Sequence, residues 1–191
     1  LQDGVASDDG LGGQDTLIGI EQVRGSDFDD VIEGSDRDTF DTDGYLEAFE
    51  GRQGDDTIDG RGGLDVVQYT TARQGVHVDL LTGQATQDGY GNTDTLSNIE
   101  AVVGSTFNDI LIARNDSTRL DGRAGNDSLV GGDDSDTLVG GTGSDTMAGG
   151  GQDPQQYCRR RETPWVSAVL GACFGSASWY SCISDFTVMR K

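Results

Sequence analysis

Apolar residues recur at a fixed interval along the second half of the chain. Leu129, Leu138 and Met147 stand nine residues apart, and glycine-rich, acidic stretches fill the intervals. Because side chains alternate between the two faces of a strand, each apolar residue with its neighbours predicts a very short strand with one inward side chain. Residues 76–80 alternate apolar and polar and predict a half-buried strand. The pattern therefore predicts an all-β chain of many short strands.

The intervals between the apolar residues are repeats of nine. Residues 122–130, 131–139 and 140–148 are three consecutive units, and residues 51–59 and 60–68 form another pair. Each unit begins with glycine, has aspartate sixth and carries its apolar residue eighth. Glycine allows positive φ and a tight turn without a Cβ clash. In the second half, the glycines expected at these turns are Gly122, Gly125, Gly131, Gly132, Gly140, Gly141 and Gly143.

A second repeat is much longer. Residues 15–30 recur as residues 94–109, at an offset of 79. The strand pattern at 76–80 precedes the second copy and has no counterpart before the first, so we expect the chain to begin within a module of a longer array. The predicted organisation is a first module at 1–68, interrupted by a surface insertion at 36–50, a second module at 69–153, and an atypical tail at 154–191.

The nine-residue units match the pattern G-G-x-G-x-D-x-U-x, in which U is a large apolar residue. The chain therefore resembles the RTX (repeats-in-toxin, hemolysin-type calcium-binding) family. The resemblance implies a parallel β-roll or β-helix solenoid in which each unit covers the apolar side of its neighbour. Two units make one coil, so turns 18 residues apart are expected on the same edge of the roll.

The sixth-position aspartates keep this register. Asp109, Asp127, Asp136 and Asp145 are separated by 18, 9 and 9 residues, which predicts one edge with Asp109, Asp127 and Asp145. Asp136 is expected on the other edge opposite Thr118, where the missing carboxylate predicts a weaker site. Carboxylates and backbone carbonyls are the oxygen ligands that calcium prefers. The predicted calcium-binding aspartates are Asp30, Asp56, Asp65, Asp109, Asp127, Asp136 and Asp145, together with the turn glycines of residues 122–148.

Two readings of the acidic residues compete with calcium binding at the nine-residue turns. Aspartate favours turns in any protein, which explains the composition and leaves the register of nine unexplained. Residues 39–50 resemble an EF-hand loop with threonine at the first ligand position. A surface insertion of the roll is the preferred interpretation of that segment, and Asp134, in place of a fourth-position glycine, could either strain its turn or add a ligand.

The charge is distributed unevenly. The formal net charge is -21, and residues 154–191 hold five basic and two acidic side chains, which leaves -24 on residues 1–153. Nucleic acids and anionic membranes require basic patches, so the body of the chain is not expected to bind either. Such a segment is either disordered or neutralised by bound cations, and the periodicity favours bound cations.

The residues needed for common catalytic sites are missing from the sequence. His77 is the only histidine, and neither H-E-x-x-H nor G-x-S-x-G occurs. The chain is therefore not expected to be an enzyme. The resemblance implies that a longer parent protein could be one, because RTX modules often follow proteases, lipases or alginate epimerases.

The tail differs in composition from the body and contains all three cysteines, Cys158, Cys173 and Cys182. Three interpretations stay open: a non-native reading frame, a C-terminal cap or secretion segment, and a weakly apolar stretch at 165–184 of about the length of a membrane span.

The predicted function is calcium binding by a secreted bacterial protein, exported by type I secretion machinery and folded by calcium outside the cell. An alternative is an adhesive, matrix or carbohydrate-binding module for a cell-surface or polysaccharide partner. It requires Tyr69 and Tyr90 to form an exposed platform, whereas the simpler interpretation of these rings is packing against the roll. A third is an accessory domain of a larger secreted enzyme.

Overall fold

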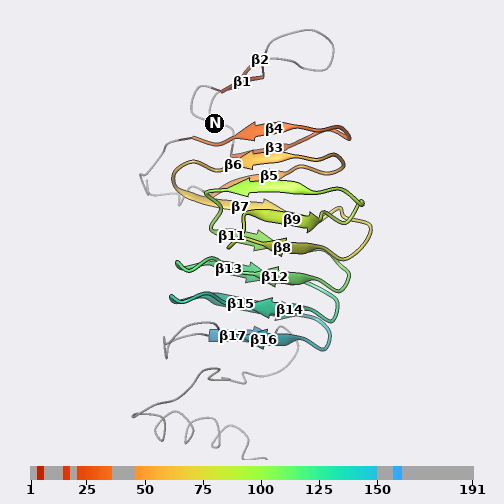
Figure 1. Cartoon of the computed structure of the whole chain (residues 1–191), viewed down its shortest axis with the longest axis vertical. Helices are drawn as coiled ribbons and strands as arrows, with labels where there is room; N and C mark the ends of the chain where they lie inside the picture. Colours follow the sequence, from red (N-terminus) through yellow and green to blue (C-terminus); the bar gives the residue numbers. More distant parts are fainter. Residues whose placement is uncertain (1–3, 7–14, 18–20, 36–45, 150–156, 161–191) are drawn as a thin grey trace, which may run out of the picture.

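The computed structural model describes residues 4–6, 15–17, 21–35, 46–149 and 157–160, and every regular element in these ranges is a β-strand (Figure 1). One sheet contains, in spatial order, β16 (Thr146–Ala148), β14 (Ser128–Val130), β12 (Ile110–Ile112), β8 (His77–Asp79), β9 (Gln84–Gln87), β10 (Asp94–Ser97), β6 (Thr57–Asp59) and β4 (Val31–Glu33). The facing sheet contains β17 (Tyr157–Arg160), β15 (Thr137–Gly141), β13 (Arg119–Asp121), β11 (Ala101–Val103), β7 (Leu64–Gln68), β5 (Leu46–Glu50) and β3 (Gln22–Arg24). β1 (Gly4–Ala6) and β2 (Asp15–Leu17) form a separate antiparallel pair.

Outside the β1–β2 pair and the segment from β8 to β10, the chain alternates between the two facing sheets, and each strand pairs in parallel with the strand one coil further on. Leu111 pairs with Leu129, and Leu129 pairs with Met147, each 18 residues apart. Leu120 pairs with Leu138 in the other sheet with the same spacing. The fold is therefore a parallel β-solenoid, as the nine-residue period predicts.

Stacked apolar side chains fill the space between the sheets. Leu129 and Leu138 are fully buried, and Met147 is half-buried and packs against them. The same column continues through side chains with no exposed surface in both sheets: Ile58, Val67, Val78, Val102, Leu111 and Leu120. One apolar residue from each short strand therefore builds the core, which confirms the predicted inward position.

A hairpin interrupts the regular coil. The predicted strand at 76–80 is confirmed as β8, with Val76, Val78 and Leu80 buried. It is followed by β9, which pairs antiparallel with both β8 and β10. β10 then returns to parallel pairing with β6. The hairpin therefore separates two neighbouring coils by far more than 18 residues along the chain.

The predicted surface insertion at 36–50 is wrong for its last five residues. Residues 46–50 form β5, which pairs in parallel with β3 and β7, and Phe49 and Glu50 are almost completely buried. The segment therefore re-enters the sheet, where a strand replaces the end of the EF-hand-like loop. Residues 36–45 lie outside the described residues.

The tail contributes one described element. Residues 157–160 form β17, which pairs in parallel with β15, so the solenoid pairing extends past residue 154. The remaining tail residues, on which the reading-frame, secretion and membrane interpretations depend, lie outside the described residues. In the part of the chain that is described, no helix is long and apolar enough to span a bilayer.

Candidate metal centre

The turns between strands stack along two edges of the solenoid. We call "first edge" the turns that enter the eight-stranded sheet and "second edge" the turns that enter the seven-stranded sheet. The sixth residue of each turn stands directly before its strand, except that Asp94 is the first residue of β10 and Asp65 the second of β7, and strand register aligns these residues. The first edge has two runs, Asp30, Asp56 and Asp94, then Asp109, Asp127 and Asp145; the second edge has Asp65, Glu100, Thr118 and Asp136.

Two hydrogen-bond ladders of opposite direction hold the first edge in register. The backbone N–H of Asp109 donates to Asp127 Oδ1 over 2.9 Å, and that of Asp127 donates to Asp145 Oδ1 over 3.1 Å. At the fifth positions, the N–H of Asn126 donates back to Asn108 Oδ1, and that of Ser144 to Asn126 Oδ1, both over 2.8 Å. The structure thus brings Asp109, Asp127 and Asp145 together in the predicted order.

The first module has the same arrangement. The N–H of Asp30 donates to Asp56 Oδ1 over 2.9 Å. Asp94, which the sequence analysis did not single out, continues this run by accepting the N–H of Asp56 over 3.2 Å and the hydroxyl of Tyr69 over 3.0 Å. The hairpin places Asp94 38 residues after Asp56, so the nonapeptide spacing could not reveal it. The long repeat, which begins at Asp15 and Asp94, was the available signal.

The second edge is less uniform. The N–H of Asp65 donates to Glu100 Oε2 over 3.0 Å, and Glu100 was also missed, because glutamate replaces the expected aspartate. The N–H of Thr118 donates to Asp136 Oδ1 over 3.0 Å, so Asp136 lies opposite a residue without a carboxylate, as predicted. Asp134 has no positive φ, so its turn adopts another conformation instead of a strained left-handed one.

Most of the sixth-position carboxylates are buried. Asp56, Asp65 and Asp109 are each 1% exposed, Asp127 is 2% and Asp136 is 3%. Burial, together with the charge of neighbouring carboxylates, raises the pKa of Asp56 and of Asp127 to about 6 and that of Asp65 to about 7. Burial likewise raises the pKa of Asp94 to about 7. The protein alone therefore disfavours the charged carboxylates that a cation would stabilise.

The turns fall into two conformational classes. In four of them the second and fourth residues are both left-handed: Arg52 and Gly54, Arg61 and Gly63, Arg123 and Gly125, Gly141 and Gly143, with φ between 63° and 137°. Other turns lack positive φ at these positions, including 25–30, 104–109 and 131–136. The predicted turn glycines therefore differ in backbone conformation: Gly125, Gly141 and Gly143 are left-handed, whereas Gly132 is not.

The conformation of a turn determines whether one of its own N–H groups donates a hydrogen bond to the sixth-position carboxylate. In the turns without positive φ, the N–H of the second residue donates to the sixth: Ser26 to Asp30 over 2.6 Å, Ser105 to Asp109 over 2.7 Å and Gly132 to Asp136 over 2.7 Å. In the left-handed turns, Oδ2 of Asp56 and Asp127 and both oxygens of Asp65 are buried without a hydrogen-bond partner. Buried polar atoms are normally paired, so these oxygens indicate a missing ligand.

Oxygen atoms from successive turns converge in front of the first glycine of a unit. A Cβ at Gly122 would lie 2.5 Å from Asp127 Oδ2 and 2.9 Å from the carbonyl oxygen of Gly140. At Gly60 the corresponding neighbours are Asp65 Oδ2 and the carbonyl oxygen of Asn98. Calcium binds oxygen at 2.3–2.6 Å and accepts mixed carboxylate and carbonyl ligands. Among the described residues no three His, Cys, Asp or Glu side chains form a metal cluster, so carbonyls would supply further ligands. The donor set therefore fits calcium.

Comparison with known families agrees with this geometry. Four segments match the RTX calcium-binding nonapeptide repeat: residues 47–68, 88–129, 112–147 and 121–154. These segments are RTX calcium-binding repeats. They include all four left-handed turns and also the turn that ends at Asp94. The comparison with curated proteins returned no match.

The raised pKa values of the RTX turns predict a pH dependence in metal-free buffer. Aspartates titrate near 3.8 when unfolded, whereas the folded pKa values of Asp56, Asp65 and Asp127 are about 6 to 7. A carboxyl with a raised folded pKa favours folding while it is protonated, so stability should fall as pH rises between these limits. We expect the β signal in far-UV circular dichroism to increase on acidification, with the gain beginning near pH 6 to 7 and complete near pH 4. A change centred near pH 4 would instead indicate exposed carboxylates.

Proposed function

We propose that this chain binds calcium ions between each left-handed turn of the roll and the turn stacked on it, and that binding drives its folding. The observation that carries the proposal is the set of buried, unpartnered carboxylate oxygens at Asp56, Asp65 and Asp127. Each belongs to a left-handed turn, and in two of these turns the second N–H donates to another aspartate, Arg61 to Asp59 Oδ1 over 3.0 Å and Arg123 to Asp121 Oδ1 over 3.1 Å. A bound cation would supply the missing partner and compensate the desolvated charge.

Calcium coupling to folding also suits an exported protein. The carboxylates of successive turns repel one another without an ion, and a site assembled from stacked turns does not exist in the unfolded chain, so binding free energy becomes folding free energy. Extracellular calcium modules have dissociation constants of about 0.1–1 mM. We therefore propose that the chain acts outside a bacterial cell after transport by type I secretion machinery, with binding rather than catalysis as its own role.

The alternative of an aromatic carbohydrate platform loses its main support. Tyr69 is 3% exposed and donates its hydroxyl to Asp94 over 3.0 Å. Tyr90 is half-buried and packs against the core, with its hydroxyl donating to the carbonyl of Thr71 over 2.6 Å. The exposed platform that this alternative requires is therefore lacking at Tyr69, and Tyr90 packs against the roll.

The function is tested by titrating calcium into the metal-free, full-length chain. We expect a cooperative gain of β signal with a midpoint of about 0.1–1 mM, and bound calcium in equilibrium dialysis. Magnesium at the same concentration should not replace it, because Mg²⁺ requires near-octahedral geometry at shorter distances. Identical spectra in calcium and in chelator, with no bound calcium, would rule out the proposal.

A further inference from the structure

One level of the roll is held together by the protein's own groups on both edges. This level consists of the turns 104–109 on the first edge and 113–118 on the second, joined by β12. On the first edge, Asp109 Oδ2 accepts the N–H of Ser105 over 2.7 Å, and Asp109 Oδ1 accepts the Ser105 hydroxyl over 2.7 Å and the N–H of Val76 over 2.8 Å. Ser105 itself is fully buried. The carboxylate of Asp109 therefore has three donors from the protein.

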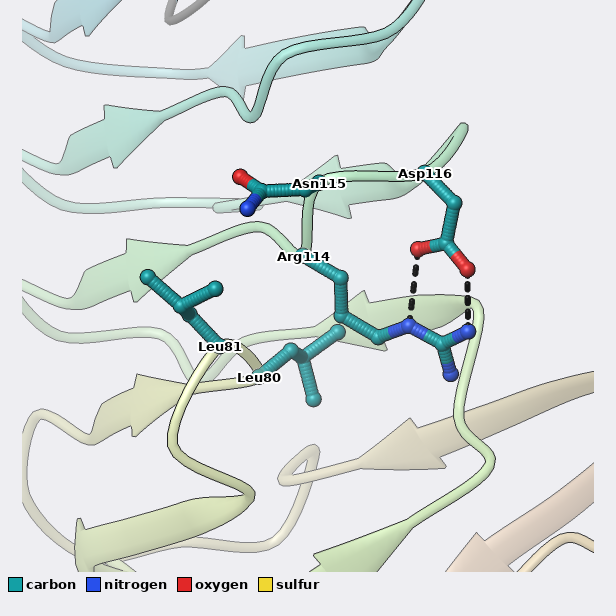
Figure 2. A pocket seen from close by; sticks show the side chains of 5 residues that line it. All are labelled: Leu80, Leu81, Arg114, Asn115 and Asp116. Atoms are coloured by element: carbon teal, nitrogen blue, oxygen red, sulfur yellow. Dashed lines mark hydrogen bonds and ion pairs between the residues drawn. The ribbon is translucent and has the colours of Figure 1, made fainter.

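On the second edge, the turn whose sixth residue is Thr118 carries a guanidinium, that of Arg114, at its second position. Figure 2 shows Arg114 directed toward Asp116, with which it makes two hydrogen bonds. Arg114 Nη1 also donates to Glu100 Oε1 over 3.1 Å and to the carbonyl oxygen of Ile99 over 3.3 Å. Two carboxylates and one carbonyl from consecutive turns thus surround a positive charge, which is the ligand set that calcium prefers.

The contrast with the following level is direct. Asp127, one coil after Asp109, has the left-handed Arg123 at the second position of its turn, so its Oδ2 lacks the donor that Ser105 gives Asp109. Resting on the calcium function proposed above, we propose that Ser105 and Arg114 replace calcium at this level of the roll. No ion binds in front of Gly104 or between Glu100 and Asp116, and the ions belong to the left-handed turns on either side.

This arrangement makes Arg114 a positioning residue with a testable signature. If the guanidinium of Arg114 only stabilises the fold, its removal lowers the stability of the protein and leaves the number of bound calcium ions unchanged. A guanidinium that stands in for calcium leaves an oxygen cage behind, formed by Glu100, Asp116 and the Ile99 carbonyl. Removing Arg114 should then create a calcium site.

The test counts bound calcium by equilibrium dialysis on full-length variants in about 10 mM calcium, above the range of extracellular sites. We expect Arg114→Ala to bind one ion more than the wild type. Arg119→Ala is the matched control, because Arg119 lies in the same coil, its side chain is 54% exposed, and its guanidinium forms an ion pair with Asp121 of its own strand, over 3.5 Å. Asp109→Asn should bind the wild-type number of ions, whereas Asp127→Asn should bind fewer.

Circular dichroism in the same buffer establishes that each variant is folded, and Arg114→Gln replaces Arg114→Ala if the smaller side chain prevents folding. An unchanged or lower ion count in the Arg114 variant overturns the proposal, as does a loss in Asp109→Asn equal to that in Asp127→Asn. If the wild type binds no calcium, the proposed calcium function itself fails. That outcome is distinct from an unchanged ion count in the Arg114 variant and from an equal loss in the two aspartate variants.

Discussion

Replacing Asp127 by asparagine is expected to raise the calcium concentration needed for folding at least about tenfold, equivalent to about 1.4 kcal/mol. Asp127 Oδ1 accepts the N–H of Asp109 over 2.9 Å, and Oδ2 is buried without a hydrogen-bond partner. The asparagine carbonyl can keep the first contact at almost unchanged volume. The substitution therefore removes mainly the charged oxygen that an ion in front of Gly122 would use.

The measurement is a calcium titration of wild-type and variant chains, followed by circular dichroism and by counting bound ions. Asp133→Asn is the matched control: it removes the same charge from the neighbouring nine-residue unit, at a position that is exposed. If both substitutions shift the titration equally, the effect comes from net charge and not from a ligand at Asp127. If neither shifts it, the ion lies elsewhere.

The regular part of the roll could be predicted because two periods coincide. A nine-residue unit places one apolar residue inward, and two units complete a coil, so Leu129, Leu138 and the aspartate column follow from spacing alone. The same arithmetic correctly placed Asp136 opposite Thr118. Parallel stacking preserves these registers because each strand covers only its immediate neighbours.

The irregular part was missed where the chain leaves that period. The hairpin of β8 and β9 moves Asp94 38 residues from Asp56, although the backbone N–H of Asp56 donates to Asp94 Oδ1. The return of residues 46–50 to the sheet as β5 was missed for a related reason, since an interruption hides the register of the residues that follow it. Long-range pairing, which local patterns do not record, determines both positions.

Turn conformation was the least predictable feature, and it matters most for the site. Glycine content predicts positive φ, yet Arg52, Arg61 and Arg123 are left-handed while Gly132 is not. Left-handed backbone disfavours residues that carry a Cβ, so the stacked turns must impose it on these arginines. A sequence match to the nonapeptide therefore identifies candidate turns, while the backbone conformation separates those whose carboxylates are satisfied from those that need an ion.

The second large effect is expected at Gly122, where a methyl group would occupy the space in which the oxygens converge. A Cβ there lies 2.5 Å from Asp127 Oδ2 and 2.9 Å from the Gly140 carbonyl oxygen, so either the carboxylate or the stacked turn must move. We expect Gly122→Ala to bind one calcium ion fewer and to unfold about 2–4 °C lower at saturating calcium, the shift that about 1 kcal/mol produces in a chain of this length.

Gly91→Ala is the control that distinguishes the effect of backbone strain from the effect of a methyl group that blocks the ion. Gly91 has φ of 105°, and no atom lies within 4 Å of its virtual Cβ, so alanine there introduces strain of about 1–2 kcal/mol without filling a cavity. It should lower the unfolding temperature and leave the ion count unchanged. A Gly122→Ala chain that keeps the wild-type count would show that calcium does not bind in front of this glycine, because the methyl group and the ion cannot share that space.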